Sequence, residues 1–214
     1  MLKIYNVKVY DLKESVIASG NAMRLEPVEY SEDEFQKGLL RMQRLVNASN
    51  KTDIHCHDNA LTGIRVSFDI TYPQYWTPEF QRYHFADIVT SSSKMHRLLK
   101  MDINKSCNEY VTEETINNLK KYIFEYNSIA DYYKGKIVEN PAKAEKEMYK
   151  AWMKVLSNTP LGLELFMRVS TNYKQLQTIY YQRRHHKLKE DWGAFIKMIE
   201  ELPYFNQLIL GKDL

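Results

Sequence analysis

The clearest chemical candidate in the sequence is Arg183, at the end of the stretch 171–183. If this stretch is a helix, Leu176, Ile179, Tyr180 and Arg183 lie on one face, at spacings i, i+3, i+4 and i+7. A guanidinium on a stripe that should be buried needs a partner, because an unpaired buried cation is costly. Two interpretations remain open. The stem packs while the head reaches water or meets a carboxylate, or Arg183 binds an anion at a cleft.

A second candidate is the run His55, Cys56, His57 and Asp58, whose side chains are of types that can ligate a metal. Catalytic zinc commonly uses three protein ligands, and the sequence contains neither a His-Glu-x-x-His helix nor paired Cys-x-x-Cys motifs. We therefore expect no metal site here. The run is interpreted as a local turn or as a histidine that lines a cofactor.

Phosphate binding, if present, must rely on side chains. The 7 glycines are scattered and no two are near neighbours, which excludes a Rossmann fingerprint and a P-loop. Arginine, lysine and serine then become the residues that could bind a phosphate. The three serines at 91–93 lack the glycines of a nucleophile elbow, so they indicate a turn, a cap or hydroxyl donors instead of a serine hydrolase.

Composition favours an ordinary globular protein. A chain of 214 residues that is 44% hydrophobic and 27% charged predicts one domain over residues 1–214. The net charge of +3 argues for neither a nucleic-acid nor a membrane partner, and the basic run 183–187 lies on all sides of a helix. No segment approaches the ~20 apolar residues that span a bilayer. Two cysteines and a start unlike a signal peptide predict a reducing, cytoplasmic location.

The elements that must position these residues follow from hydrophobic periodicity and capping signals. Strands are predicted at 2–10, 61–71 and 161–171, and helices at 12–24, after the Ser31–Glu34 capping box, from Thr77 towards Met101 with a break near the serines, from Thr112, from Asn140, at 173–187 and at 190–202. Mixed strands and helices without a repeat predict an α+β (α/β mixed) domain with a central sheet flanked by helices.

Several segments, taken in their order along the chain, resemble motifs of the flavin-dependent thymidylate synthases. The stretch 57–68 falls on the family's F-E-H-x-x-F-T-F strand, and Gln81 and Arg82 fall on the Q-x-x-R that opens its R-H-R-x-x-S signature. The stretches 171–176 and 179–183 match its T-x-N-x-R-S-L and F-L-x-L-R motifs. The resemblance covers most of the chain and implies that family's fold.

The signature itself is altered. Where the family has R-H-R-x-x-S-x-N-E-x-S-x-R, this chain keeps the first arginine as Arg82 and the later serine as Ser92, and has Lys94 for the last arginine. Other positions carry different residues, among them Tyr83, Asp87, Val89 and Thr90. Val89 and Thr90 replace the family's asparagine and glutamate, and so remove polar groups from the signature.

The resemblance implies a homotetramer that binds FAD beside a dUMP-type pyrimidine nucleotide, with NADPH and methylenetetrahydrofolate as cosubstrates. The reaction would transfer a one-carbon unit to the pyrimidine 5-position. The implied roles are catalytic for Arg183 and Ser92, substrate-binding for Arg82, Ser92, Lys94 and Arg183, and cofactor-binding for His57, Arg82, His84, Asn172 and Lys174. The altered signature supports an alternative, in which a catalytically degenerate relative serves as a nucleotide-binding or regulatory protein.

Overall fold

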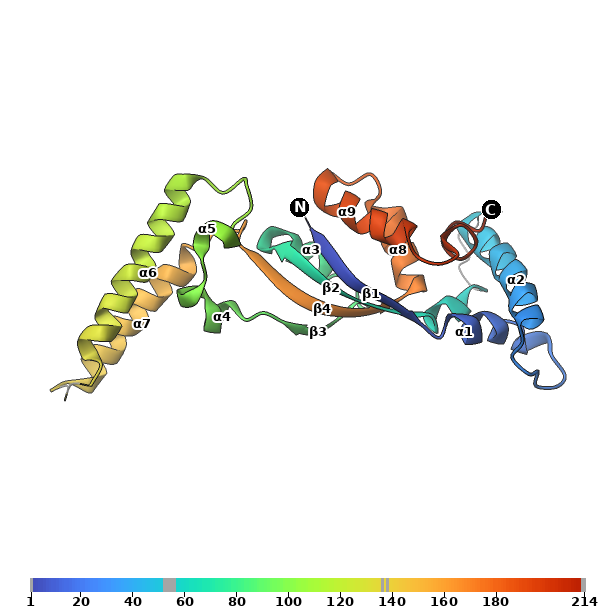
Figure 1. Ribbon diagram of the computed structural model, residues 1–214, viewed down its shortest axis with the longest axis horizontal. Helices are drawn as coiled ribbons and strands as arrows, with labels where there is room; N and C mark the ends of the chain where they lie inside the picture. The colour runs from blue at the N-terminus through green and yellow to red at the C-terminus, as the bar shows by residue number, and fades with distance from the viewer. Residues whose placement is uncertain (1, 52–56, 136, 138, 213–214) are drawn as a thin grey trace. The chain divides into compact units, whose positions relative to one another are not determined.

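The computed structural model describes residues 2–51, 57–135, 137 and 139–212 (Figure 1). Its contacts divide the chain into two compact units. The first unit comprises Met1–Thr71, Pro78–Ser91 and Met167–Leu214, and the second comprises Tyr72–Thr77 and Ser92–Phe166.

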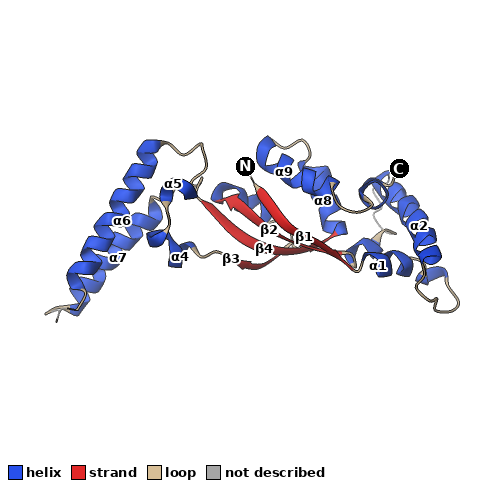
Figure 2. Ribbon diagram, viewed as in Figure 1, coloured by secondary structure: helices blue, strands red, loops and turns tan. Residues whose placement is uncertain are grey.

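Four strands form one sheet in the order β1 (Lys3–Tyr10), β2 (Arg65–Pro73), β4 (Glu164–Asn172) and β3 (Asp87–Ser91) (Figure 2). β1 runs antiparallel to β2, and β3 antiparallel to β4. The alternation that predicted the second strand is confirmed, because Ile64, Val66, Phe68 and Ile70 are all completely buried. Because these strands combine with many helices along the chain, the mixed α+β class is also confirmed.

β1 lies at one edge of the sheet and is irregular. Asn6 has a positive φ of 54°, and the pairing with β2 shifts register between Tyr5 and Lys8. The Asn6 amide donates to one carboxylate oxygen of Asp69 at 2.6 Å, and Arg168 donates to the other at 3.1 Å. A polar cluster on the sheet therefore joins β1, β2 and β4.

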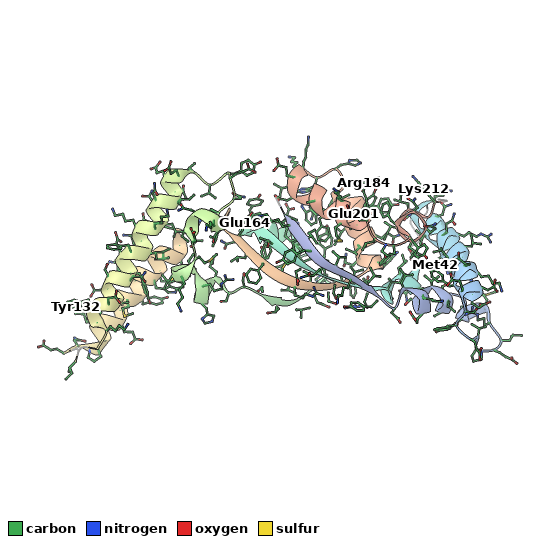
Figure 3. The ribbon with its side chains drawn as sticks, viewed as in Figure 1. Met42, Tyr132, Glu164, Arg184, Glu201 and Lys212 are labelled. Carbon is green, nitrogen blue, oxygen red and sulfur yellow. The ribbon has the colours of Figure 1, made fainter. Side chains whose placement is uncertain are left out.

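Helices of the first unit surround an aromatic core. Phe195 contacts Phe68, Phe80 and Trp192, with ring centroids 5.6–5.9 Å apart. The predicted capping box is confirmed, because the Ser31 hydroxyl accepts a hydrogen bond from the Glu34 amide at 3.2 Å. The helices are α1 (Leu12–Ala18), α2 (Glu32–Lys51), α8 (Tyr173–Arg183) and α9 (Lys189–Glu200), with a short π-helical turn at Asn206–Leu210. Figure 3 labels Arg184, which follows α8 and stacks over the Tyr181 ring at 5.0 Å.

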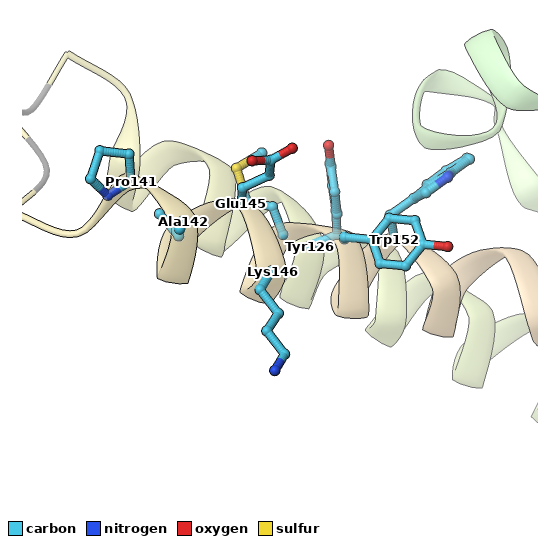
Figure 4. Close-up of a pocket in the computed structure, with 9 residues that line it drawn as sticks. Tyr126, Pro141, Ala142, Glu145, Lys146 and Trp152 are labelled. Atoms are coloured by element: carbon cyan, nitrogen blue, oxygen red, sulfur yellow. The ribbon is translucent and has the colours of Figure 1, made fainter.

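The second unit is built on a pair of helices, α6 (Glu113–Tyr133) and α7 (Pro141–Ser157), with short helices α4 (Lys94–Arg97) and α5 (Ile103–Ser106). Thr112 and Asn140 cap the two long helices, as their sequences predicted. The core of the unit consists of Leu98, Ile103, Leu119, Val155 and Leu163. An open groove of about 690 Å³ runs along the pair, and Figure 4 shows Tyr126 and Trp152 among its lining side chains.

Four predicted elements were wrong in extent or type. The helix expected from Thr77 ends at Phe80 as α3 (Thr77–Phe80), and residues 87–91 form β3 instead. Ile88, Val89 and Thr90 are β-branched, and β4 offers their backbone a pairing partner. Leu161, expected on the inner face of a strand, is 67% exposed because β4 begins only at Glu164. The helices predicted at 12–24 and 173–187 end early, at Ala18 and Arg183.

None of the described helices combines the length and apolar character needed to cross a bilayer.

Candidate functional site

A pocket of about 340 Å³ in the first unit gathers three of the residues that the sequence singled out, Arg82, His84 and Arg183. Its volume lies near the lower end of the roughly 300–1,000 Å³ usual for small-molecule sites. Helix α8 and the turn that follows α3 line it. The lining residues are Arg82, Tyr83, His84, Phe85, Gln175, Thr178, Gln182 and Arg183.

Hydrogen bonds to α8 and to the end of β4 fix the turn that carries Arg82 and His84. The Phe85 amide donates to the Gln175 side chain at 3.3 Å, and the Thr171 hydroxyl donates to the Phe85 carbonyl at 2.8 Å. Arg82 and His84 are exposed. Within the described part of the chain neither makes a hydrogen bond or an ion pair, so both can contact a ligand.

Arg183 ends α8 with a side chain only 15% exposed. Its Nε donates to the Tyr83 hydroxyl at 2.7 Å, and its Nη1 lies 3.5 Å from Oε2 of Glu79. The guanidinium also stacks on the Trp192 ring, 4.8 Å from the centroid. The head of Arg183 therefore meets a carboxylate, as the first interpretation expected. The residue also lines a pocket, where anion binding stays a prediction.

Glu79 is the main residue that sequence reasoning missed. Its Oε2 accepts a hydrogen bond from the Trp192 indole at 2.8 Å and lies 3.6 Å from Nε2 of His186, in addition to Arg183. Glu79 and Arg183 are separated by 104 positions, and no local pattern links them.

A polar stripe on α8 was also missed, although the sequence contained its signal. Gln175, Thr178 and Gln182 are spaced i, i+3 and i+7, which places them on one helix face, and all three line the pocket. The Tyr83 hydroxyl donates to the Gln182 side chain at 3.1 Å. The stripe gives the pocket neutral donors and acceptors next to its cations.

The opposite end of α8 holds three residues that the resemblance assigns to the flavin. Asn172 caps the helix, accepting from the Gln175 amide at 2.8 Å. Lys174 donates to the Asp58 carboxylate at 2.6 Å, and Asp58 is only 1% exposed. His57 is exposed and precedes Asp58 in the chain. At 1.5 Å per residue, Lys174 lies about 13 Å along the helix axis from Arg183.

The metal-like run is only partly visible, because His55 and Cys56 lie outside the described residues. Elsewhere in the described chain, no group of three histidine, cysteine or carboxylate side chains could hold a metal ion.

Ser92 and Lys94 belong to the second unit. Ser92 continues the strand pairing beyond β3, because its amide donates to the Phe166 carbonyl at 2.8 Å and its hydroxyl oxygen accepts from the Phe166 amide at 3.0 Å. Lys94 donates to the Gln74 side chain at 2.8 Å. The altered signature residues Asp87, Val89 and Thr90 lie in β3 and are exposed.

The phenols along α8 are neutral at physiological pH. Burial raises the pKa of Tyr173, of Tyr180 and of Tyr181 above the ordinary value. These tyrosines therefore contribute hydroxyl groups and no negative charge near Arg183 and Arg184.

By sequence, the chain matches no protein-family model and no curated protein. Its fold nevertheless matches solved structures. Flavin-dependent thymidylate synthase ThyX from Helicobacter pylori, complexed with FAD and dUMP, aligns over 96% of this chain and 98% of its own, with a TM-score of 0.57 and 16% identity. A second structure of that protein with FAD and dUMP aligns over 98% of this chain and 97% of its own, with a TM-score of 0.58 and 16% identity.

The UMP/dUMP methylase PolB from Streptomyces cacaoi, bound with 5-Br dUMP, aligns over 99% of this chain and 95% of its own. Its TM-score is 0.58 at 10% identity. This chain therefore has the fold of the flavin-dependent thymidylate synthases, as its sequence motifs predicted.

Proposed function

We propose that this protein binds FAD and a dUMP-type pyrimidine nucleotide and transfers a one-carbon unit to the pyrimidine 5-position. The observation that carries the proposal is the structural match over nearly the whole chain to proteins solved with FAD and dUMP or with 5-Br dUMP. Parts of two motifs that suggested the same family from sequence line the pocket, namely Arg82 at the start of the signature and several residues of the stretch 171–183.

The residues present fit a flavin nucleotide. Arg82 and His84 are exposed on the pocket and have no partner in the described chain, which suits them to a pyrophosphate. The amides of Gln175 and Gln182 add neutral hydrogen-bonding groups. A pocket of about 340 Å³ admits one end of a dinucleotide, so the rest of the flavin would lie against other surfaces. This fits the proposed homotetramer, in which another subunit supplies them.

For the pyrimidine nucleotide, Arg183 is the proposed catalytic residue. Its Nη2 makes no hydrogen bond within the described part of the chain, and the residue lines the pocket. A guanidinium beside the pyrimidine stabilises the negative charge that develops on the ring during attack. Ser92 is proposed as a second catalytic residue and, with Lys94, as a ligand of the nucleotide phosphate. The Ser92 hydroxyl proton remains available to donate, because only its oxygen is used by Phe166.

When bound, the reduced flavin supplies the hydride that completes the methyl group, with NADPH as its reductant and methylenetetrahydrofolate as the carbon donor. The contribution of this chain is positioning. Tyr83 and Trp192 fix the Arg183 guanidinium on two sides, and misplacement by about 1 Å costs on the order of a hundredfold in rate.

A second candidate is a catalytically degenerate relative that binds nucleotides without turnover. The specific observation in its favour is that Arg183, the proposed catalytic cation, already meets the carboxylate of Glu79. The loss of polar groups at Val89 and Thr90 points the same way.

One experiment separates the two. The purified protein is examined for a flavin absorption spectrum, then incubated with FAD, NADPH, methylenetetrahydrofolate and dUMP while loss of hydrogen from the pyrimidine 5-position is followed. We expect the protein to bind flavin and to release hydrogen slowly from the pyrimidine 5-position. Flavin and dUMP binding without release would favour the degenerate relative, and absence of both kinds of binding would contradict both candidates.

A further inference from the structure

Arg183 lines the pocket and pairs with Glu79, which does not line it. The Glu79 side chain is 30% exposed and that of Arg183 15%, so the pair is shielded from water on most sides. The attraction between two such charges is stronger than at an open surface, because the effective dielectric constant is lower. Both charges are also held by neutral groups, Glu79 by the Trp192 indole and Arg183 by the Tyr83 hydroxyl.

The hydrogen bond from Trp192 holds the Glu79 carboxylate in place even when Arg183 binds another group. The indole bond to Oε2 is 2.8 Å, whereas the distance from Oε2 to Nη1 of Arg183 is 3.5 Å, at the long end for a hydrogen bond. Glu79 can therefore loosen from Arg183 and keep its shorter bond. His186, with Nε2 3.6 Å from the same oxygen, offers a second group on that side.

An anion that approaches Arg183 from the pocket meets a guanidinium whose charge is already balanced. It also meets the negative charge of Glu79, which repels it. Arg82 and His84 carry no such counter-charge in the described chain. The pocket thus contains one compensated cation and two uncompensated basic groups.

We infer that Glu79 is an internal counter-anion that withholds the charge of Arg183 from phosphate-bearing ligands, so that such a ligand gains Nη1 of the guanidinium only by displacing Glu79. This rests on the proposed function in one respect, the choice of a pyrimidine nucleotide as the ligand. Glu79 acts through Arg183 and is therefore a positioning residue. It sets how tightly this pocket binds an anion.

The test uses Glu79→Gln in the full chain, because glutamine keeps an oxygen for the Trp192 indole and removes only the charge. Binding of inorganic phosphate and of dUMP is measured by calorimetry for the unaltered protein and the variant. We expect roughly tenfold tighter binding of both probes in the variant, the lower end for one charge-assisted hydrogen bond. Glu29→Gln is the matched control, since Glu29 is an exposed carboxylate in the same unit, and its affinities should stay within about twofold.

A double-mutant cycle makes the test specific. In an Arg183→Ala background, Glu79→Gln should bring a much smaller gain, because only the repulsion by Glu79 is removed and the cation that it withholds is absent. An equal gain with and without Arg183 would overturn the inference and indicate a general charge effect. Thermal unfolding of each variant shows that the comparison is made between folded proteins.

The remaining outcomes separate this inference from the proposed function. Equal dUMP binding by the unaltered protein and Glu79→Gln would overturn the inference and leave the nucleotide function standing. Tighter phosphate binding by the variant, without any flavin or dUMP binding, would support the inference and contradict the function. If neither protein binds either probe, both are contradicted.

Discussion

The two ends of α8 carry residues of the matched motifs whose side chains are used in different ways. At its beginning, Asn172 caps the helix and Lys174 pairs with the buried Asp58, so both side chains are committed within the protein. At its end, Arg183 lines a pocket beside Arg82 and His84, which are exposed and unpaired in the described chain. The resemblance assigned residues at both ends to ligands. A motif match therefore identifies a position, and the local contacts decide whether its side chain is available to a ligand.

The largest expected effect comes from removing the ion pair between Lys174 and Asp58 at the beginning of α8. Lys174→Met leaves Asp58, 1% exposed, as an unpaired buried charge. Loss of one partner of a buried pair costs about 3–5 kcal/mol, so we expect a reduction of that size in the free energy of unfolding, measured by urea denaturation.

The double variant Lys174→Met with Asp58→Asn is the control, and it should regain most of the loss. If the single variant were within 1 kcal/mol of the unaltered protein, Lys174 would be free for a ligand and the contrast between the two ends would disappear.

The second effect concerns the end of α8 at Arg183, where Arg82 also lines the pocket. Arg82→Ala should weaken FAD or dUMP binding by about 1.5–3 kcal/mol, the scale of a charged hydrogen bond, with little change in thermal stability. Arg44→Ala is a matched control, since Arg44 is exposed in the same unit. Unchanged binding by titration, or a large loss of stability, would show that Arg82 is not a ligand residue.

A third, smaller effect sharpens the role of Asn172. Asn172→Ala removes the cap of α8 and should cost about 1 kcal/mol of stability, whereas Asn172→Asp keeps an oxygen acceptor and should cost less. Denaturation and flavin binding are measured on both variants. A loss of flavin affinity in the aspartate variant, without a loss of stability, would mean that Asn172 contacts the cofactor as the resemblance implies.

The smallest effect uses Asp69 as a reference for an ordinary structural cluster. Hydrogen bonds from Asn6 and then Arg168 hold the pKa of Asp69 below its usual value. A carboxyl group with a lowered pKa stabilises the fold above its unfolded pKa of about 3.9, and this contribution is lost as the pH falls through the folded pKa. Asp69→Asn should remove that acid-dependent part, at most about 1 kcal/mol, seen by denaturation between about pH 5 and pH 2. An unchanged acid dependence would contradict the pairing.

Sequence predicted well those elements whose signals are local. The alternation at Ile64, Val66, Phe68 and Ile70 reports a burial that any pairing partner would produce. Caps such as Thr112 depend only on the next few residues. β3 was missed because its five exposed residues have no inward stripe, and their strand conformation comes from pairing with β4, far along the chain.

The site shows the same division. The position of Arg183 on an inner helix face was readable from α8 itself, and so was the stripe of Gln175, Thr178 and Gln182. Its partner Glu79 was not, because a contact across 104 positions arises only when α3 and α9 pack beside α8. The helical period can identify which face of a helix is buried, but it cannot identify which carboxylate contacts that face.

The irregular edge strand β1 affects how the protein behaves in concentrated solution. An exposed edge offers free backbone donors and acceptors to other molecules and is a common starting point for aggregation. Here Asn6 adopts a left-handed conformation in the middle of the strand, and lysines at positions 3 and 8 are exposed. A second chain that approached this edge would meet a bend and two positive charges instead of a flat ladder. The irregularity at Asn6 thus disfavours fibre-like self-association at that edge of the sheet.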